Sequence, residues 1–184
     1  MSGWAKKRFW KEATVDEEQG GFSVLLDGRA LRTPAKAHLV VPTRALADAI
    51  AAEWDAQSGE IRPQSMPATR AANAAIDKVA HQHAEVADML AAYGGTDLLC
   101  YRAEQPAELI ERQNAGWDPM LDWAEDVLGV RLRAVAGVMH IAQDEEVLER
   151  LRANVHGLDS FRLAAFHDLV SLSGSLILGF AAAQ

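Results

Sequence analysis

The sequence predicts an α+β protein, in which a small antiparallel β-rich N-terminal domain is followed by a larger helical domain. Residues 9–41 carry the only convincing strand pattern, with short apolar runs separated by glycine and proline. From Thr69 almost to the end of the chain, the apolar residues instead recur at helical spacing. We therefore expect a small sheet first and a helical bundle after it.

Turn residues divide the N-terminal region into strands. Gly20-Gly21 forms a turn before the apolar run 22–26. Asp27-Gly28 is the strongest hairpin signal, because both central residues of a type I′ turn need positive φ. A return strand is predicted at 29–33 and a further strand at 38–41, each stopped by a proline.

The first helix is predicted to run from the N-cap Thr43 to about Gln57. Leu46, Ile50 and Trp54 recur every four residues and form a stripe that should pack on the sheet. Two prolines then predict an extended connection. The two prolines are Pro63 and Pro67, and we place the domain boundary there. This gives a β-rich domain at 1–62 and a helical domain at 63–184.

Glycines and an extended segment interrupt the predicted helices of the second domain. Gly94-Gly95 breaks the first helical stretch, and the apolar segment 97–102 follows it. A helix is predicted to begin at Asp118 as N-cap, with Pro119 in its first turn, and to end at Gly129. Residues 130–142 are predicted to be extended and 144–152 and 159–184 to be helical, with one apolar stripe formed by Leu158, Phe161, Ala165 and Leu169.

Composition and charge exclude several classes of protein. Apolar residues make up 49% and charged residues 24% of the 184 residues, which is typical of a globular chain. The formal net charge of -8, without a basic cluster, argues against nucleic-acid binding.

The acidic stretch 104–126 is interpreted as a solvated helix face, with a docking surface for a basic partner as the alternative. Its carboxylates are Glu104, Glu108, Glu111, Asp118, Asp122, Glu125 and Asp126, and its one base is Arg112.

The cysteine count, the N-terminal sequence and the longest uncharged run predict a protein of a reducing compartment that is not embedded in a membrane. Cys100 is the single cysteine, lies in an apolar run, and is interpreted as a buried inert thiol. The beginning of the chain, with Trp4 among charged residues, does not resemble a secretory signal. Residues 169–184 form the longest uncharged run, but as a helix it would be only ~24 Å long, so we expect a core helix.

The sequence contains no pattern that predicts a catalytic residue, a metal site or a cofactor. His81 and His83 are two residues apart and diverge on a helix. Gly94-Gly95-Thr96 lacks the glycine spacing and the lysine of a phosphate-binding loop. A carboxylate pair, Asp122 with Glu125 or Asp126, can in principle share a proton. A small hydrolase or lyase that uses such a pair is therefore kept as an alternative function.

The chain resembles the assembly chaperone family that binds the alpha subunit of the F-type ATP synthase catalytic head. Each motif is weak alone, but their order and spacing are specific. The resemblance covers nearly the whole chain, and its motifs are KRFW at 7–10, GGFSVLLDGRALRTP at 20–34, VPTRALADAIAAEWDAQ at 41–57, TDLLCYRAEQP at 96–106 and WDPMLDWAEDVLGV at 117–130.

The resemblance implies a chaperone that shields the unassembled alpha subunit from aggregation, without catalysis or a cofactor. It implies the cytoplasm for a bacterial member and the mitochondrial matrix for eukaryotic relatives. It also implies an acidic helical tail beyond the segment 175–184 in most members. A further alternative is a scaffold protein that is not a chaperone and that binds the assembled synthase equally well.

Six residues are predicted to contact the partner. They form two groups in the motifs above, and for Trp54 a core role is the alternative, because it lies on the apolar stripe. The six residues are Glu53, Trp54, Asp55, Asp97, Tyr101 and Arg102.

Overall fold

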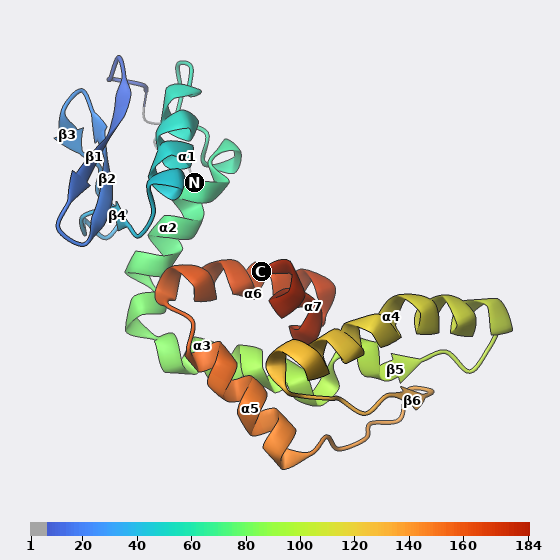
Figure 1. Cartoon of the computed structure of the whole chain (residues 1–184). Helices are drawn as coiled ribbons and strands as arrows, with labels where there is room; N and C mark the ends of the chain where they lie inside the picture. The colour runs from blue at the N-terminus through green and yellow to red at the C-terminus, as the bar shows by residue number, and fades with distance from the viewer. Residues whose placement is uncertain (1–6) are drawn as a thin grey trace, which may run out of the picture. The chain divides into compact units, whose positions relative to one another are not determined.

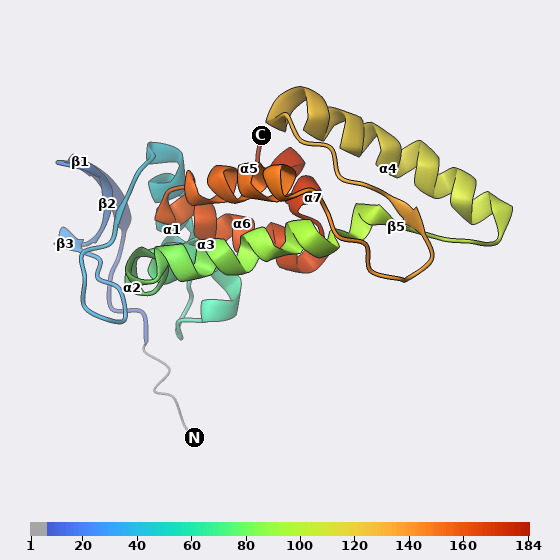
Figure 2. The same ribbon diagram turned by 90° about the horizontal axis from the view of Figure 1, so that it is seen from below.

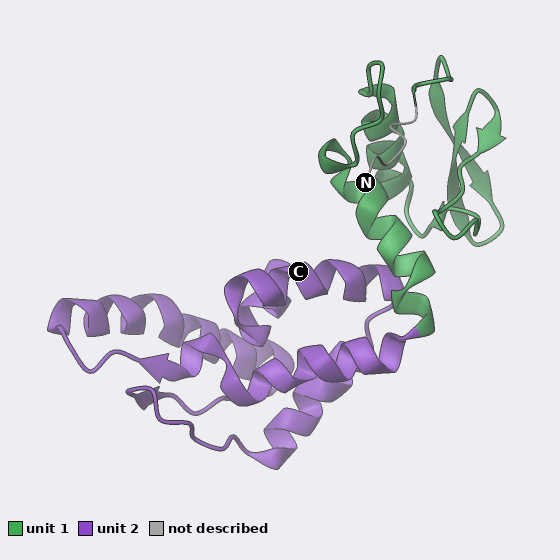
Figure 3. Cartoon of the chain, turned by 180° about the vertical axis from the view of Figure 1, so that it is seen from behind, with its two compact units in different colours: residues 1–81 green, residues 82–184 purple. Residues whose placement is uncertain are grey.

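The computed structural model of the chain describes residues 7–184. Trp4 therefore lies outside the described residues. The contacts divide the chain into two compact units, unit 1 at Met1–His81 and unit 2 at Gln82–Gln184 (Figure 3). Residues 63–81, assigned to the helical domain from the sequence, group with unit 1 because α2 (Pro67–Asp77) packs on α1 (Arg44–Asp55).

Unit 1 is built on a four-stranded antiparallel sheet (Figure 1). The central strand β2 pairs with each of the other three strands, and its register with β1 runs from Ala13 opposite Leu26 to Glu18 opposite Gly21. Gly21 has to be a glycine, since a Cβ on it would collide with the carbonyl oxygen of Val41. The strands are β1 (Ala13–Glu18), β2 (Gly21–Leu26), β3 (Arg29–Ala30) and β4 (Val40–Val41).

The predicted hairpin is confirmed. Asp27 has φ of 48° and Gly28 has φ of 79°, the left-handed values that a type I′ turn needs. The predicted return strands, however, are shorter than expected. Between these two strands, Thr33 forms a turn with Ala37: the Thr33 amide donates to the Ala37 carbonyl at 3.0 Å, and the Thr33 hydroxyl accepts from the Ala37 amide at 3.1 Å.

The helix α1 begins as predicted, since the hydroxyl of Thr43 accepts from the amide of Leu46 at 3.3 Å. The predicted stripe is only partly right. Ile50 is fully buried, but the buried face is completed by Ala47 and Ala51, whereas Leu46 and Trp54 are half-buried. Small residues at the centre of this face let the helix lie close to the sheet.

The extended connection predicted around the two prolines is wrong. Pro63 starts a short 3₁₀ turn, Pro63–Ser65, and Pro67 is the first residue of α2. A proline has no amide to donate and its φ already suits a helix, so the first turn accepts it without loss. A further 3₁₀ turn, Val79–His81, ends unit 1.

Unit 2 is mostly helical, with one pair of two-residue strands that run parallel and a long non-helical segment at 129–144 (Figures 1 and 2). The helices α3 and α5 pack side by side, and α6 packs on both α3 and α7. Its elements are α3 (His83–Ala91), β5 (Tyr101–Arg102), α4 (Ala107–Leu128), β6 (Val135–Ala136), α5 (Glu145–His156), α6 (Ser160–Ser173) and α7 (Leu176–Ala182), with 3₁₀ turns at Ala92–Thr96 and Leu98–Cys100.

The helix α4 is longer than predicted. It begins after Pro106, so Asp118 is not an N-cap, and Pro119 lies inside the helix. The proline removes one hydrogen bond to the carbonyl four residues earlier. The helix continues through this position because helical turns flank it, Asp118 pairs with Arg102, and Leu121 is buried in the core. The predicted stop is confirmed, since Gly129 has φ of 66°.

The C-terminal stretch forms two helices and not one. Gly174 takes a left-handed φ of 68° and ends α6. The buried face of α6 is formed by Leu163, Phe166 and Val170, so the predicted stripe was displaced around the helix. Gly179 of α7 lies against two of these residues. Among the described residues, no helix is long and apolar enough to cross a membrane.

Candidate partner-binding site

Glu53, one of the predicted contact residues, caps a helix of its own unit. The N-cap position of α2 is occupied by Met66, which has no oxygen in its side chain. From α1, Glu53 accepts from the amide of Ala68 at 2.6 Å, and from the amide and the hydroxyl of Thr69 at 2.8 and 2.7 Å. A carboxylate is favoured at this positive end of a helix. Glu53 therefore ties α2 to α1.

Asp55 joins the end of α1 to the start of β1 and to Arg8 before it. Its Oδ1 accepts from the amide of Ala13 at 3.0 Å and lies 3.4 Å from Nη2 of Arg8. The same guanidinium donates through Nη1 to the carbonyl of Asp55 at 2.6 Å and to that of Gln57 at 2.9 Å. The carboxylate of Asp55 is nevertheless 46% exposed. It can therefore still be reached by another protein.

Trp54 belongs to an aromatic cluster with Phe9 and Trp10. The Trp10 and Trp54 rings meet edge to face at 5.0 Å between centroids, and Phe9 meets Trp10 in the same way at 5.1 Å. Trp10 is buried and Trp54 half-buried, but Phe9 is 69% exposed. Trp54 was predicted as a contact residue from the sequence, but Phe9, the member of the cluster that faces the solvent, was not.

Asp97 is fully buried and acts inside unit 2. One oxygen accepts from the amide of Leu99 at 3.0 Å, and the other accepts from the amides of Leu176 and Ile177 at 2.7 and 3.1 Å. The last two amides belong to the first turn of α7, where an amide has no acceptor within the helix, and the hydroxyl of Ser175 accepts from the next one, Leu178, at 3.0 Å. Burial raises the pKa of the Asp97 carboxyl, and its backbone donors act in the opposite direction.

Arg102 fastens β5 to α4. Its Nε donates to the carbonyl of Leu99 at 2.8 Å and its Nη1 to Oδ1 of Asn114 at 3.1 Å. Its Nη2 lies 2.8 Å from Oδ1 of Asp118, an ion-pair distance, although the two groups are not aligned for a hydrogen bond. The guanidinium also covers the ring of Trp117 at 5.4 Å. With 8% exposure, Arg102 is mainly a positioning residue.

Tyr101 precedes Arg102 and is half-buried. Its backbone pairs with Val135 of β6, and its hydroxyl lies 3.2 Å from Nδ1 of His140. Tyr101 is thus the member of the second predicted group with ring surface open to the solvent. The two groups of predicted residues lie in different units, with Glu53, Trp54 and Asp55 in unit 1 and the other three in unit 2.

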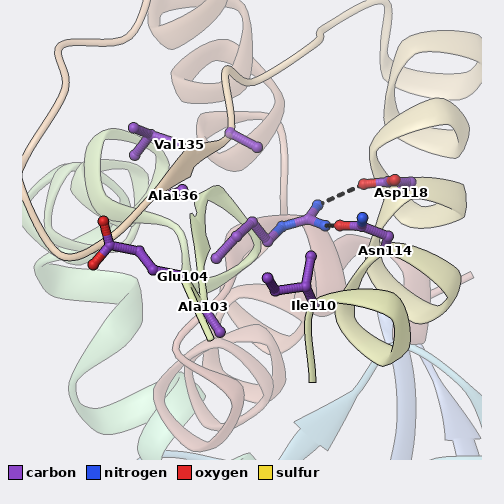
Figure 4. A pocket seen from close by; sticks show the side chains of 9 residues that line it. Ala103, Glu104, Ile110, Asn114, Asp118, Val135 and Ala136 are labelled. Carbon is purple, nitrogen blue, oxygen red and sulfur yellow. Dashed lines mark hydrogen bonds and ion pairs between the residues drawn. The ribbon is translucent and has the colours of Figure 1, made fainter. Parts of the chain in front are cut away.

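A groove that sequence reasoning did not find lies beside Arg102. Two hollows, of about 450 and about 550 Å³, open between α4 and the segment 131–141 and share Asp118, Ala134 and Val135. Figure 4 shows the first hollow, with Glu104 on one side and Asp118 with Asn114 on the other. No local pattern marks this groove, because its two walls are up to about 30 residues apart in the sequence.

Asp122 and Glu125, the candidate catalytic pair, contact an arginine and not each other. Oxygens of both Asp122 and Glu125 lie 2.7 Å from Nη1 of Arg131, so each carboxylate faces a base and not the other acid. Burial raises the pKa of the Cys100 thiol to about 12, which makes it a poor nucleophile. Within residues 7–184, no group of three or more His, Cys, Asp or Glu side chains is placed to hold a metal ion.

The two units together define an α+β protein whose described polar groups mostly hold its own helices together. Residues 7–125 match the protein family described as ATP12 chaperone protein. The chain therefore belongs to the ATP12 chaperone family, and the resemblance found from the sequence motifs is confirmed.

Relatives of known structure extend the match to nearly the whole chain. Atp12 from Paracoccus denitrificans is 54% identical with a TM-score of 0.94, over 98% of this chain and 77% of that one. A protein of Agrobacterium tumefaciens is 46% identical with a TM-score of 0.89, over 95% of this chain and 66% of that one. These similarities confirm the predicted α+β fold, with its N-terminal antiparallel sheet and mostly helical remainder.

The similarity also reaches mitochondrial proteins. Protein atp12 of Schizosaccharomyces pombe, a mitochondrial protein, is 34% identical over 186 residues, which cover 95% of this chain. The chain spans only 64% of the length of that relative.

Proposed function

We propose that this protein is a chaperone that binds the unassembled alpha subunit of the F-type ATP synthase and prevents its aggregation while the catalytic head is assembled. The observation that carries the proposal is membership of the ATP12 chaperone family, together with 54% identity to Atp12 of Paracoccus denitrificans over almost the whole chain. The bacterial relatives favour the cytoplasm as its location.

The physical basis is the exposed surface of an orphan subunit. Subunits that bury a large common interface in a complex expose an apolar patch when they are alone, and such patches promote self-association. A chaperone that covers this patch needs no chemical reaction. It leaves when the beta subunit competes for the same surface with higher affinity.

The polar groups of the chain support a binding role over catalysis. Most candidate acids and the thiol have a structural explanation: Glu53 and Asp97 cap helices, Asp122 and Glu125 neutralise Arg131, and Cys100 is buried with a raised pKa. An enzyme would instead hold a poised acid and base around a common substrate pocket. We therefore assign the chain no catalytic role.

The proposal is tested by light scattering of isolated alpha subunit. We expect this protein to suppress the rise in scattering at about equimolar ratio and to elute with the alpha subunit on size exclusion. A chaperone also prefers the free subunit, whereas a scaffold protein would bind the assembled catalytic head equally well. Unchanged aggregation without co-elution would refute the chaperone function.

Of the six predicted residues, we propose that Tyr101, Trp54 and Asp55 contact the partner directly, since their side chains are partly exposed and none of them caps a helix. Glu53, Asp97 and Arg102 support the same surfaces from below. The comparison of Trp54→Ala with Asp55→Ala tests the first unit. We expect Asp55→Ala to weaken binding of the alpha subunit with a smaller change in melting temperature than Trp54→Ala.

The opposite pattern would leave only a structural role for these residues. It would consist of binding and stability lost together in Trp54→Ala, with neither lost in Asp55→Ala. Thermal unfolding and isothermal titration of the same two proteins separate these outcomes.

A further inference from the structure

We propose that the groove between α4 and residues 131–141 of unit 2 holds an extended segment of the partner, in which a lysine or arginine lies next to apolar residues. This inference rests on the proposed chaperone function and names the surface that performs it. It is carried by three features of the described residues: a continuous hollow with an apolar floor, an unpaired strand edge, and an excess of acidic side chains without ion-pair partners.

The floor of the groove is apolar and its walls are fixed. Leu121 and Leu132 are 3% and 2% exposed and lie under the second hollow, and Ile110 and Val135 line the first. Arg102 holds α4 against β5 through Asn114 and Asp118, so the first hollow is formed before any partner arrives. Each hollow is large enough for one or two side chains of a bound segment.

The strand β6 lines the first hollow and has a second backbone edge. In the described two-stranded sheet its neighbour is β5, and Ala136 is exposed. The opposite edge of such a strand offers hydrogen bonds to an extended segment. Val138 and Met139 directly after it are 90% and 77% exposed and provide apolar surface where the segment would leave the groove.

The charges around the groove favour a basic occupant. Within the described residues, each arginine along it is already in an ion pair: Arg102 with Asp118 at 2.8 Å, Arg131 with Asp122 and Glu125 at 2.7 Å, and Arg133 with Asp144 at 3.6 Å. The described ion pairs do not include Glu104 or Glu111.

Glu104 lines the first hollow, and Glu111 is less than one helical turn from Asn114 on the groove side of α4. Arg112, on the same helix, is also outside the described ion pairs. A cationic side chain of the partner fits with its stem on Ile110 and Val135 and its head at Glu104.

The test compares two double variants that remove the same charge from different places. Glu104→Gln with Glu111→Gln neutralises the groove. Glu108→Gln with Asp126→Asn is the matched control. These two residues lie on one face of α4, five helical turns apart, and that face points about 120° away from Asn114. All four side chains are exposed, so we expect both proteins to fold.

At low ionic strength, the groove variant should bind isolated alpha subunit about tenfold more weakly than the unmodified protein, and the control should differ by about twofold at most. Added salt should shrink the difference, since it screens exposed charges. Equal loss in both variants, or loss in neither, would overturn the groove proposal while leaving the chaperone function intact. Absence of binding by the unmodified protein would refute the chaperone function itself.

A cross-link identifies the occupant directly. Ala134 is exposed and lines both hollows, and Ala153 on α5 is an exposed control. Each is changed to cysteine and labelled with a benzophenone maleimide, with which buried Cys100 should not compete. We expect Ala134→Cys to cross-link the alpha subunit through a peptide that contains Lys or Arg, and Ala153→Cys not to. A cross-link from Ala134→Cys to a second copy of the chaperone would overturn the proposal.

Discussion

Glu53 in unit 1 and Asp97 in unit 2 have the same task in different surroundings. Each carboxylate reaches a helix distant in the sequence and accepts from its first free amides, Glu53 at the start of α2 and Asp97 at the start of α7. Glu53 remains partly open to water, whereas Asp97 is fully buried. Water can replace a lost cap in the first case but not in the second, so the same contact should matter more in unit 2.

The units also differ in charge. Residues 1–81 contain 11 Lys and Arg and 10 Asp and Glu, for a formal charge of +1, whereas residues 82–184 contain 7 Arg and 16 Asp and Glu, for a formal charge of -9. All the net negative charge of the chain is therefore in unit 2, where the groove is. A basic partner should be attracted to this unit and not to the sheet.

The largest effect is expected for Asp97→Ala. It leaves three buried amides without an acceptor, and we expect the free energy of unfolding of unit 2 to fall by about 3 to 5 kcal/mol. Hydrogen exchange of the Leu176 and Ile177 amides should accelerate before that of α3. A loss below about 1 kcal/mol would show that burial of Asp97 does not strengthen its cap.

A smaller effect is expected for Glu53→Ala, at about 1 to 2 kcal/mol, which is the range of an exposed helix cap. The amides of Ala68 and Thr69 should lose protection against hydrogen exchange, whereas the amides of β2 should keep theirs. Glu53→Gln is the control, since it keeps the length of the side chain and one acceptor oxygen, and it should lose less. If Glu53→Ala cost as much as Asp97→Ala, exposure would not be the reason for the difference between the two caps.

The smallest effect is expected for Asp27→Asn, and it depends on pH. The backbone amides of Glu12 and Lys11 donate to this exposed carboxylate and hold the pKa of Asp27 below its usual 3.8. The folded form therefore binds this proton less readily than the unfolded form. The added stability is fully present above pH 3.8 and is lost as the pH falls through the lowered pKa.

Denaturant unfolding between pH 2.5 and 7 measures this effect. Asp27→Asn preserves the turn, because asparagine accepts a left-handed φ, and it should flatten only the acid part of the stability curve. Identical acid dependence in both proteins would mean that these hydrogen bonds do not persist in solution. Unlike the buried cap at Asp97, this contact lies at the exposed surface.

Local signals in the sequence were reliable where one or two neighbouring residues decide the backbone. The Asp27-Gly28 turn, the Thr43 cap and the Gly129 stop were each predicted and found, because positive φ and a short capping side chain are local properties. The motif pattern also identified the family. Burial was less predictable: the stripe on α6 was displaced, because which face of a helix is covered depends on what packs against it.

The sequence by itself determined the fold class, the turns and the acidic character of the C-terminal half. Only the tertiary structure decided that Glu53 and Asp97 cap distant helices, that α4 continues through Pro119, and that a groove opens beside Arg102. The physical reason is range. A turn or a cap next to its helix involves atoms a few residues apart, whereas these features arise between segments up to 80 residues apart, which chain folding alone brings together.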